Sequence, residues 1–523
     1  MNQFKTWIAG ALSGFFLVAC FPKLNLHPLV WIACLPLLLV LAGAASPWRA
    51  FAYAYFSGAI FLTGTCYWFV EVTRQYGRLS LTLALTALLA FVVVFSLFFG
   101  AFGLVVGGVA RRRSPALALL LSPFLWVATE LVRTHLITGF PWNLLGYAVP
   151  FAGLRQIACV TGVYGLSFLA ATTSALGAWA FGSRRRKWPC LALGGWAALL
   201  VVGNWALAPP APTKGLNLAL LVQPNVPLDE ASATTWAPWL NPAKLNQLVT
   251  MSLEALSTEK RKENTALDEK GQQHIVGPPL IIWAENPAPF YFTRDQVFRD
   301  AVERMAVLGR AYVVVNTVVP HGSGTSQITN SAVVVDPQGR EILQYDKMHL
   351  VPFGEYVPAW AFPSMIGRIT SEAGDFVPGS SYRVAPTPDG AVGIFICYED
   401  IFPQLVRRLT LAGAQVLVNI SNDAWFGDSA AAFQELEMAR LRAIENRRYL
   451  LRATNDGITA SIDPYGRVEK QIARHQTAVL HAYFGYWRGQ SFYTRHGDVF
   501  AWLCTALAGA IVLVTALSFR SVS

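Results

Sequence analysis

Eight long apolar runs constrain this chain more than any other feature. Of its 523 residues, 54% are hydrophobic and 14% are charged, a balance typical of polytopic membrane proteins. A helix of about 20 apolar residues can cross the hydrocarbon core of a bilayer. We therefore predict a membrane bundle of eight transmembrane helices, at about 6–21, 28–46, 51–70, 81–109, 115–132, 152–182, 189–208 and 497–518.

The polar residues are concentrated in one segment between the seventh and eighth apolar runs. The proline-rich sequence Ala208–Pro212 at its start has the composition of a linker. We expect three parts: a seven-helix transmembrane bundle in 1–208, one large polar domain in 209–496, and an eighth helix with a short tail in 497–523.

Basic residues next to the apolar runs predict the orientation. If the spans alternate, the following basic residues all fall on one side: Lys5, Arg49, Arg111–Arg113, Arg184–Lys187 and Arg520. Short basic loops favour the cytoplasm, so we expect both termini to be cytoplasmic and the polar domain to be extracytoplasmic. This also accounts for the net charge of +10. The sequence carries no nucleic-acid motif, and we expect no nucleic-acid partner.

The first apolar run ends in Leu17-Val18-Ala19-Cys20, which is similar to the lipobox of a lipoprotein signal peptide. Such segments are removed from mature proteins and are not spans. Because seven further spans follow, we favour an uncleaved helix here.

The polar segment alternates strand-like and helix-like stretches. Leu216–Val222, Pro279–Trp283 and Ala311–Val319 are typical of buried strands, and Ala431–Leu450 of a long helix. The turn sequence Asp-Pro-x-Gly-Arg occurs twice, at Asp336–Arg340 and Asp463–Arg467, and it is suited to a β-hairpin at each place. We predict a layered α/β domain with helices outside two sheets.

Cys397 is the one cysteine in the large polar segment of the chain. The other six lie in or beside apolar runs: Cys20, Cys34, Cys66, Cys159, Cys190 and Cys504. Cys397 follows a predicted buried strand and precedes a predicted helix at 401–412, whose dipole would favour the thiolate. It is either a nucleophile or a buried free thiol that packs as a small hydrophobe.

Glu285 and Lys347 complete a possible acyl-transfer site. Glu285 ends a predicted strand, and Lys347 follows another. Strand ends are where α/β folds place functional groups. A carboxylate can remove the thiol proton, and an ammonium can stabilise the oxyanion. Alternatively, Glu285 is a strand-end cap and Lys347 is a surface charge.

Several motifs resemble the nitrilase superfamily and, more closely and over essentially the whole length, the apolipoprotein N-acyltransferase family of bacterial membranes. They are Trp283–Pro287, Tyr345–Pro358, Cys397–Asp400, Thr138–Tyr147 and Asn419–Gly427. The resemblance implies an αββα sandwich with a catalytic triad: Glu285 as base, Lys347 as oxyanion support and Cys397 as nucleophile.

The resemblance also implies supporting residues: Glu355, Tyr398, Glu399 and Asn330. Glu399 could instead simply cap the following helix. Residues expected to face lipid are Trp425, Phe426, Phe353, Trp142 and Trp236, with Trp239 competing for the last position. Ordinary packing is the alternative for Trp425, Phe426 and Phe353. Trp142 and Tyr147 could equally be interfacial aromatic anchors.

The function implied is ping-pong acyl transfer at the bacterial inner membrane. An acyl chain would pass from a phospholipid, such as phosphatidylethanolamine, through a Cys397 thioester to the N-terminal amine of a diacylglyceryl apolipoprotein. The catalytic domain would be periplasmic and the protein a monomer. We expect no cofactor and no metal, because His274, His321 and His349 are scattered.

Two other functions are alternatives to acyl transfer. A membrane-tethered amidase would use the same triad to hydrolyse a soluble amide, but it would not need eight spans. A transporter with an outside binding domain would carry polar residues or broken helices in mid-membrane. The predicted spans are nearly uncharged apart from Glu130, which argues against transport.

Overall fold

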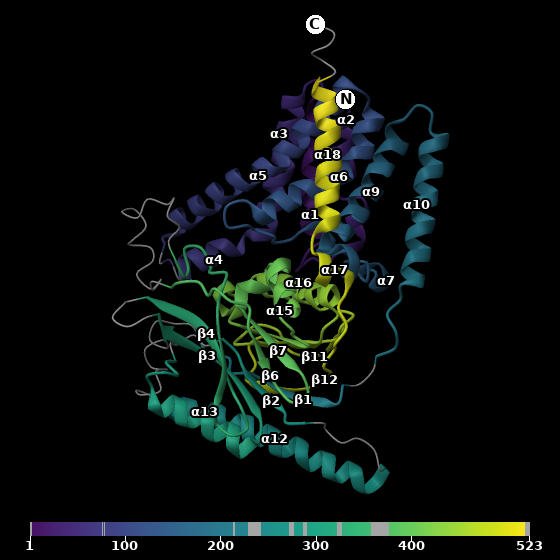
Figure 1. Ribbon diagram of the computed structural model, residues 1–523. Helices are drawn as coiled ribbons and strands as arrows, with labels where there is room; N and C mark the ends of the chain where they lie inside the picture. The colour runs from purple at the N-terminus through teal and green to yellow at the C-terminus, as the bar shows by residue number, and fades with distance from the viewer. Residues whose placement is uncertain are drawn as a thin grey trace.

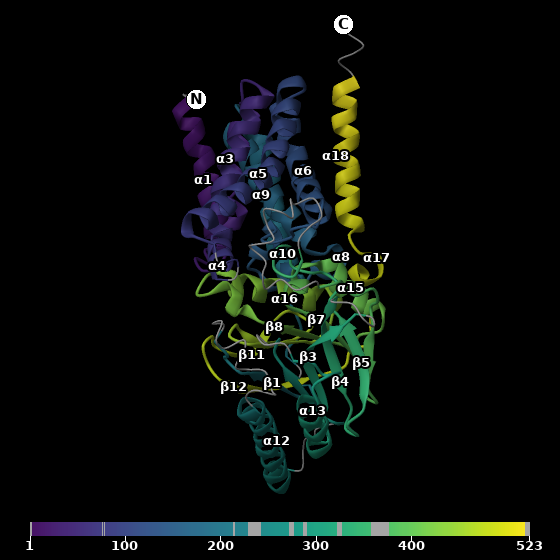
Figure 2. The same cartoon turned by 90° about the vertical axis from the view of Figure 1, so that its left-hand side faces the viewer.

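The computed structural model describes residues 3–75, 77, 79–212, 215–227, 242–270, 277–285, 290–321, 327–356 and 376–517. These residues form a helical bundle stacked on an α/β domain (Figure 1). The beginning of the first helix, Gln3–Ala19, and the end of the last helix, Val499–Leu517, lie at the end of the bundle that is remote from the α/β domain (Figures 1 and 2).

The bundle contains long helices joined by short helical turns. Its helices are α1 (Gln3–Ala19), α2 (Leu35–Ala42), α3 (Pro47–Cys66), α4 (Trp68–Gln75), α5 (Leu81–Arg112), α6 (Pro115–His135), α7 (Ala152–Arg155), α8 (Ala158–Thr161), α9 (Val163–Gly182), α10 (Lys187–Ala206) and α18 (Val499–Leu517), with 3₁₀ turns η1 (His27–Trp31) and η2 (Leu145–Ala148). Serine N-caps start several of them: Ser46, Ser80 and Ser114 accept backbone N–H groups of the first turn.

Three helices of the described residues are long and apolar enough to cross a membrane by length and composition: α5, α6 and α10. Each of the eight predicted spans contains a helix, but three are interrupted. The run 51–70 passes from α3 to α4 at Tyr67. The run 28–46 divides into η1 and the eight-residue α2. The run 152–182 divides into α7, α8 and α9, and Gly162 between the last two has a φ of +65°. The count of eight crossings therefore remains a prediction.

The α/β domain contains two six-stranded sheets. The first has the order β12-β1-β2-β3-β4-β5 and the second β11-β10-β9-β8-β7-β6. The strands are β1 (Asn217–Gln223), β2 (Leu280–Trp283), β3 (Tyr312–Pro320), β4 (Ile328–Val335), β5 (Glu341–Asp346), β6 (Val384–Pro386), β7 (Ala391–Ile396), β8 (Val416–Ser421), β9 (Leu450–Thr454), β10 (Thr459–Ile462), β11 (Val468–Ile472) and β12 (Ala478–Phe484).

The two sheets have the same internal arrangement. In each, three parallel strands (β1-β2-β3 or β7-β8-β9) continue into an antiparallel hairpin (β4-β5 or β10-β11). The repeated turn sequence closes both hairpins. Asp336 accepts the backbone N–H groups of residues 338 and 340, and Asp463 accepts those of 465 and 467. The two predicted hairpins are confirmed.

Helices cover both outer faces of the sheet pair. Helices α12 (Pro242–Lys270) and α13 (Gln296–Gly309) pack on the first sheet at the end of the molecule away from the bundle. Helices α15 (Pro403–Leu411) and α16 (Ala431–Asn446) lie between the second sheet and the bundle (Figure 2). Alternate residues of the central strands, such as Leu221 and Ile394, form the core between the sheets. This is the predicted αββα sandwich.

Two predicted helix boundaries are wrong. Helix α16 ends at Asn446 rather than residue 450, because Arg447 adopts a left-handed C-cap with a φ of +52°. After Cys397 the chain forms a five-residue 3₁₀ turn, η3 (Cys397–Ile401), before α15 begins at Pro403. Proline fits the first turn of a helix, where its missing N–H costs nothing.

Candidate active site

Cys397 lies on a strained turn at the carboxyl end of β7. Its φ is +54°, in the left-handed region that residues with a Cβ rarely adopt, and only 7% of the residue is exposed. Burial raises the pKa of its thiol well above the usual value, and the carboxylate of Glu285 adds to the rise. The expectation that a helix dipole would favour the thiolate is therefore wrong: burial dominates, and a general base is needed to remove the proton.

Glu285 follows β2 and is 7% exposed. Its Oε1 accepts a hydrogen bond from Asn330 Nδ2 at 2.9 Å. Its buried Oε2 has no hydrogen-bond partner among the described residues. Burial raises the pKa of this carboxyl, whereas Lys347 and hydrogen bonds from Asn330 and Cys397 oppose the rise. A carboxylate of raised pKa with a vacant oxygen can accept the thiol proton.

Lys347 follows β5 and is 1% exposed. Its Nζ lies 2.9 Å from Glu355 Oε1 and 3.7 Å from Glu285 Oε1. Burial alone would lower the pKa of this ammonium, but the two carboxylates outweigh it and hold the pKa above its usual value. Lys347 is thus a fixed positive charge and not a proton donor near neutral pH.

The sheet topology explains why these groups meet. Strand β5 runs parallel to β2, since two antiparallel pairings connect β3 to β5 through β4. The residues that follow β2 and β5, Glu285 and Lys347, therefore emerge at one edge of the first sheet. Asn330 lies near the start of the antiparallel β4, at that same edge.

Asn330 connects the two glutamates. Its Nδ2 donates to Glu285 Oε1 and to Glu355 Oε1, both at 2.9 Å. Its Oδ1 accepts from Asn316 Nδ2 at 2.8 Å, which fixes the orientation of the amide. Asn316 on β3 was not among the predicted residues. A polar amide in the valine-rich run Val313–Val319 was the signal that could have identified it.

Glu399 ties the nucleophile turn to the lysine loop. Its Oε2 accepts from the backbone N–H of Ile396 at 2.7 Å, and its Oε1 from those of Met348 at 2.7 Å and His349 at 3.1 Å. The hydroxyl of Tyr345 donates to the same carboxyl. Burial raises the pKa of Glu399 to about 7. Glu399 therefore does cap the turn after β7, and it also fixes the segment that carries Lys347.

A group of aromatic rings adjoins the nucleophile turn on the bundle side. Trp142 lies between Tyr398 (centroids 6.5 Å apart) and Phe426 (5.9 Å), and Trp68 packs on both Trp142 and Phe426. Trp142 is 1% exposed and its Nε1 donates to Gln434 Oε1. It is therefore buried at the junction of bundle and domain, and is not an exposed anchor.

The other predicted lipid-facing residues are dispersed. Trp425 is half-buried, and Phe353 is 39% exposed with a φ of +64°. Tyr147 is buried, and its hydroxyl accepts from Arg442, so it too is not an exposed anchor. Trp236 and Trp239 lie outside the described residues.

A buried cluster of three carboxylates and one arginine includes Asp400 of the nucleophile turn η3. The guanidinium of Arg452 lies 2.7–3.1 Å from three carboxylates, those of Asp400, Asp423 and Glu435, and all four side chains have 0% exposure. Burial raises the pKa of Asp400 to about 7 and that of Glu435 well above its usual value. This cluster was not predicted, although Arg452 within an apolar strand was a signal for a buried ion pair.

Comparison with known proteins assigns both parts of the chain. Residues 221–483 match the family model described as carbon-nitrogen hydrolase, and residues 13–176 match that described as apolipoprotein N-acyltransferase N-terminal domain. The α/β domain thus belongs to the carbon-nitrogen hydrolase class, as its two-sheet fold and buried cysteine indicate.

Relatives that match over nearly the whole chain identify the family within this class. The chain is 35% identical to the apolipoprotein N-acyltransferase of Geobacter metallireducens over 99% of its own length and 96% of that protein. It is 31% identical to the apolipoprotein N-acyltransferase of Pseudomonas paraeruginosa over 92% and 89% of the two chains. The chain belongs to the apolipoprotein N-acyltransferase family.

Among solved structures, an amidase from Nesterenkonia sp. is similar to this chain. It is 17% identical, with a TM-score of 0.36, and the similarity covers 55% of this chain and 94% of the amidase.

Proposed function

We propose that this protein catalyses the last acylation of bacterial lipoproteins through a covalent thioester at Cys397. Membership of the family makes it an acyltransferase that N-acylates lipoproteins in a bacterial membrane. The proposal adds the acyl donor, a phospholipid such as phosphatidylethanolamine, and the roles of individual residues. The observation that carries it is the convergence of Glu285 and Lys347 on the buried thiol of Cys397.

In the first half-reaction, the Cys397 sulfur attacks the carbonyl carbon of a phospholipid ester. Glu285 takes the thiol proton as the carbon–sulfur bond forms, and Lys347 stabilises the negative charge on the carbonyl oxygen. When the intermediate collapses, the carbon–oxygen bond breaks and Glu285 returns the proton to the lysophospholipid oxygen. The acyl chain remains on Cys397 as a thioester.

In the second half-reaction, the α-amine of a diacylglyceryl-cysteine attacks the thioester carbonyl. Glu285 accepts the proton that the amine loses and returns it to the sulfur as the carbon–sulfur bond breaks. The products are an amide and a free Cys397 thiol. Every proton and acyl group is accounted for without a cofactor.

The position of the site supports lipid substrates. The second sheet reaches the bundle through α15 and α16 (Figure 2), so the nucleophile turn lies close to the bundle. Extracting a lipid from the membrane costs about 0.8 kcal/mol per CH₂, a cost that a membrane-embedded enzyme avoids. We place the enzyme in the inner membrane as a monomer with eight spans, cytoplasmic termini and a periplasmic domain. The beginning of α1 and the end of α18 lie at the far end of the bundle, which supports this topology.

Intact mass spectrometry of the full-length protein in detergent micelles tests the proposal. After incubation with phosphatidylethanolamine, we expect a mass gain of one acyl chain that maps to Cys397 and is removed by hydroxylamine. Adding a diacylglyceryl peptide should discharge the adduct and acylate the peptide amine. The variant Cys397→Ser should show neither thioester nor turnover. Absence of the adduct, with Cys397 still open to alkylation, would refute the thioester route and redirect the search to soluble amides.

A further inference from the structure

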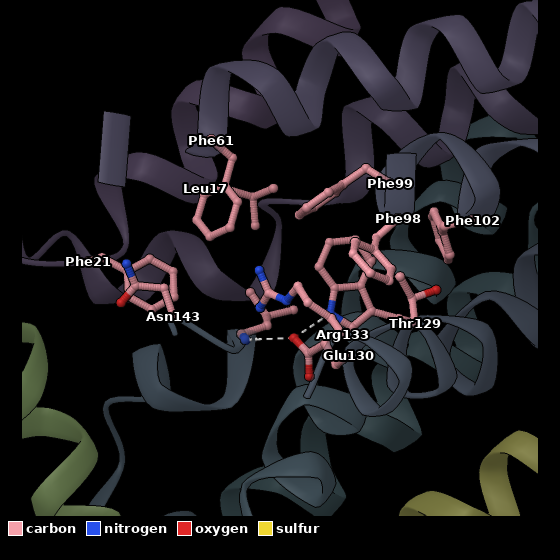
Figure 3. Close-up of a pocket in the computed structure, with 12 residues that line it drawn as sticks. Leu17, Phe21, Phe61, Phe98, Phe99, Phe102, Thr129, Glu130, Arg133 and Asn143 are labelled. Carbon is pink, nitrogen blue, oxygen red and sulfur yellow. Dashed lines mark hydrogen bonds between the residues drawn. The ribbon is translucent and has the colours of Figure 1, made fainter. Parts of the chain in front are cut away.

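Two charged side chains lie inside the helical bundle, on the last turns of α6. Glu130 is 5% exposed and Arg133 is 3% exposed. They border a cavity of ≈ 20 Å³, and the surrounding side chains are largely aromatic: Phe21, Phe61, Phe98, Phe99, Phe102 and Trp126 (Figure 3). Charged groups in such surroundings are costly, and they usually mark a function.

Both side chains bind the backbone of the segment 142–145, where the loop after α6 leads into η2. Arg133 Nη2 donates to the carbonyl oxygen of Trp142 at 3.1 Å. Glu130 Oε1 accepts from the backbone N–H of Leu145 at 2.8 Å and from Trp126 Nε1 at 2.9 Å (Figure 3). Between the two contact points, Asn143 has a φ of +51°. The pair therefore holds a strained loop at two points three residues apart.

The Arg133 guanidinium obtains its hydrogen bond from this loop. The Trp142 carbonyl is its only hydrogen-bond acceptor in the described parts of the chain, and its buried Nη1 has no partner there. The Glu130 carboxylate, one turn earlier on α6, supplies an opposite charge to Arg133. A buried pair of charges is weak evidence for a gain in the stability of the fold. The presence of Arg133 is better explained by where it places Trp142.

Trp142 extends from this loop to the nucleophile turn. Its ring packs on Tyr398, the residue after Cys397, with centroids 6.5 Å apart and planes 23° apart. Its Nε1 donates to Gln434 on α16 at 2.6 Å. A continuous series of contacts thus leads from α6, through the loop and Trp142, to the turn that carries the nucleophile.

We propose that Glu130 and Arg133 are positioning residues for acyl transfer. They fix the 142–145 segment so that the Trp142 ring stays packed on Tyr398, next to the nucleophile. This inference rests on the proposed function of Cys397. It assigns the membrane bundle a role in the chemistry, beyond holding the enzyme in the bilayer.

The test is the rate of Cys397 acylation by phosphatidylethanolamine in mixed micelles, measured on the full-length protein. For Arg133→Met we expect the maximal acylation rate (kcat) to fall at least about tenfold. The KM for phosphatidylethanolamine should change less than about threefold, because small displacements in a site mainly reduce turnover. Arg133→Lys should retain most of the rate, since an ammonium can still donate to the Trp142 carbonyl. Glu130→Gln should also retain it, whereas Glu130→Leu should not.

A double-mutant cycle separates positioning from general loss of structure. If Arg133 acts through Trp142, then Arg133→Met should cause no further loss in a Trp142→Ala background. Additive losses would overturn the inference, as would equal losses in Glu130→Gln and Glu130→Leu. Ser122→Ala is the matched control, because Ser122 is buried on the same helix and, among the described residues, its hydroxyl bonds only the Leu119 carbonyl.

The outcome for the wild-type protein distinguishes the two proposals. If wild type forms no adduct, the thioester mechanism itself fails. If wild type forms the adduct and Arg133→Met acylates at the same rate, the thioester mechanism stands and the positioning role is refuted.

Discussion

The ammonium of Lys347 lies 2.9 Å from the carboxylate of Glu355. The same ammonium is 3.7 Å from Glu285, which is a weaker contact. Glu355 therefore serves as the main counter-ion of Lys347. This arrangement leaves Glu285 less strongly paired, and its Oε2 has no hydrogen-bond partner among the residues that the structure describes, so that it can accept a proton.

Replacing Glu355 should impair acylation without removing the nucleophile. In Glu355→Gln, Lys347 would turn to Glu285 as its remaining counter-ion, which lowers the basicity of Glu285. We expect the rate of Cys397 acylation to fall by about 10²-fold, the usual order for impaired general-base catalysis. Glu341→Gln, an exposed glutamate at the start of β5, is the control. A wild-type rate in Glu355→Gln would contradict this counter-ion role.

The Asn330 amide should set the pH dependence of acylation. Its hydrogen bond favours the charged form of Glu285 and so lowers a pKa that burial raises. Because the base acts when deprotonated, the rate should rise as pH rises through this pKa. In Asn330→Ala the pKa of Glu285 should rise further, and the ascending limb should move to higher pH. Acylation rates from about pH 5 to about pH 9 would show the shift. An unmoved limb, or one shifted to lower pH, would disprove the assignment.

The acidic cluster around Arg452 predicts a pH-dependent stability. Burial raises the folded-state pKa of Asp400 to about 7, against about 3.9 in an unfolded chain. Between these values the folded state binds the extra proton, so the free energy of unfolding contributed by this group falls as pH rises toward about 7. Asp400→Asn removes the titration. We expect the Tm difference, Asp400→Asn minus wild type at a fixed scan rate, to be more positive at about pH 8 than at about pH 5. A difference independent of pH would argue against this titration.

Much of the architecture could be predicted because it depends on local patterns. Apolar runs indicated the bundle, and β-branched runs with repeated Asp-Pro-x-Gly-Arg turns indicated the hairpins in both sheets. Motifs beside strand ends indicated Glu285, Lys347 and Cys397, which the structure brings together. Their catalytic roles remain predictions.

The remaining features depend on contacts between distant segments. Asn316 acquires its role from pairing between β3 and β4, and Arg452 meets carboxylates from three separate elements. The expected thiolate at Cys397 was wrong because a dipole argument does not include desolvation, which requires knowledge of what surrounds the sulfur. The buried position of Trp142 likewise follows from contact between the bundle and the α/β domain.

Phe426 should determine how the thioester is partitioned between amine and water. Its ring is 8% exposed and packs against Trp68 and Trp142, with centroids 5.2 and 5.9 Å away. Removing the ring in Phe426→Ala would open space beside Trp142, whose ring packs on Tyr398 next to the nucleophile, so water would reach the acyl-enzyme more readily. We expect the ratio of free fatty acid to N-acylated peptide to rise severalfold, measured by mass spectrometry after a single acyl loading.

The control for this experiment is Phe492→Ala, which removes a ring that is 49% exposed on α17 (Phe492–His496). It should leave the ratio at the wild-type value. Lower total turnover in Phe426→Ala with an unchanged ratio would assign Phe426 to ordinary packing, the alternative that its sequence context left open. A raised ratio would show that the aromatic group between bundle and domain keeps the enzyme a transferase, since the same thioester exposed to water makes it a phospholipase.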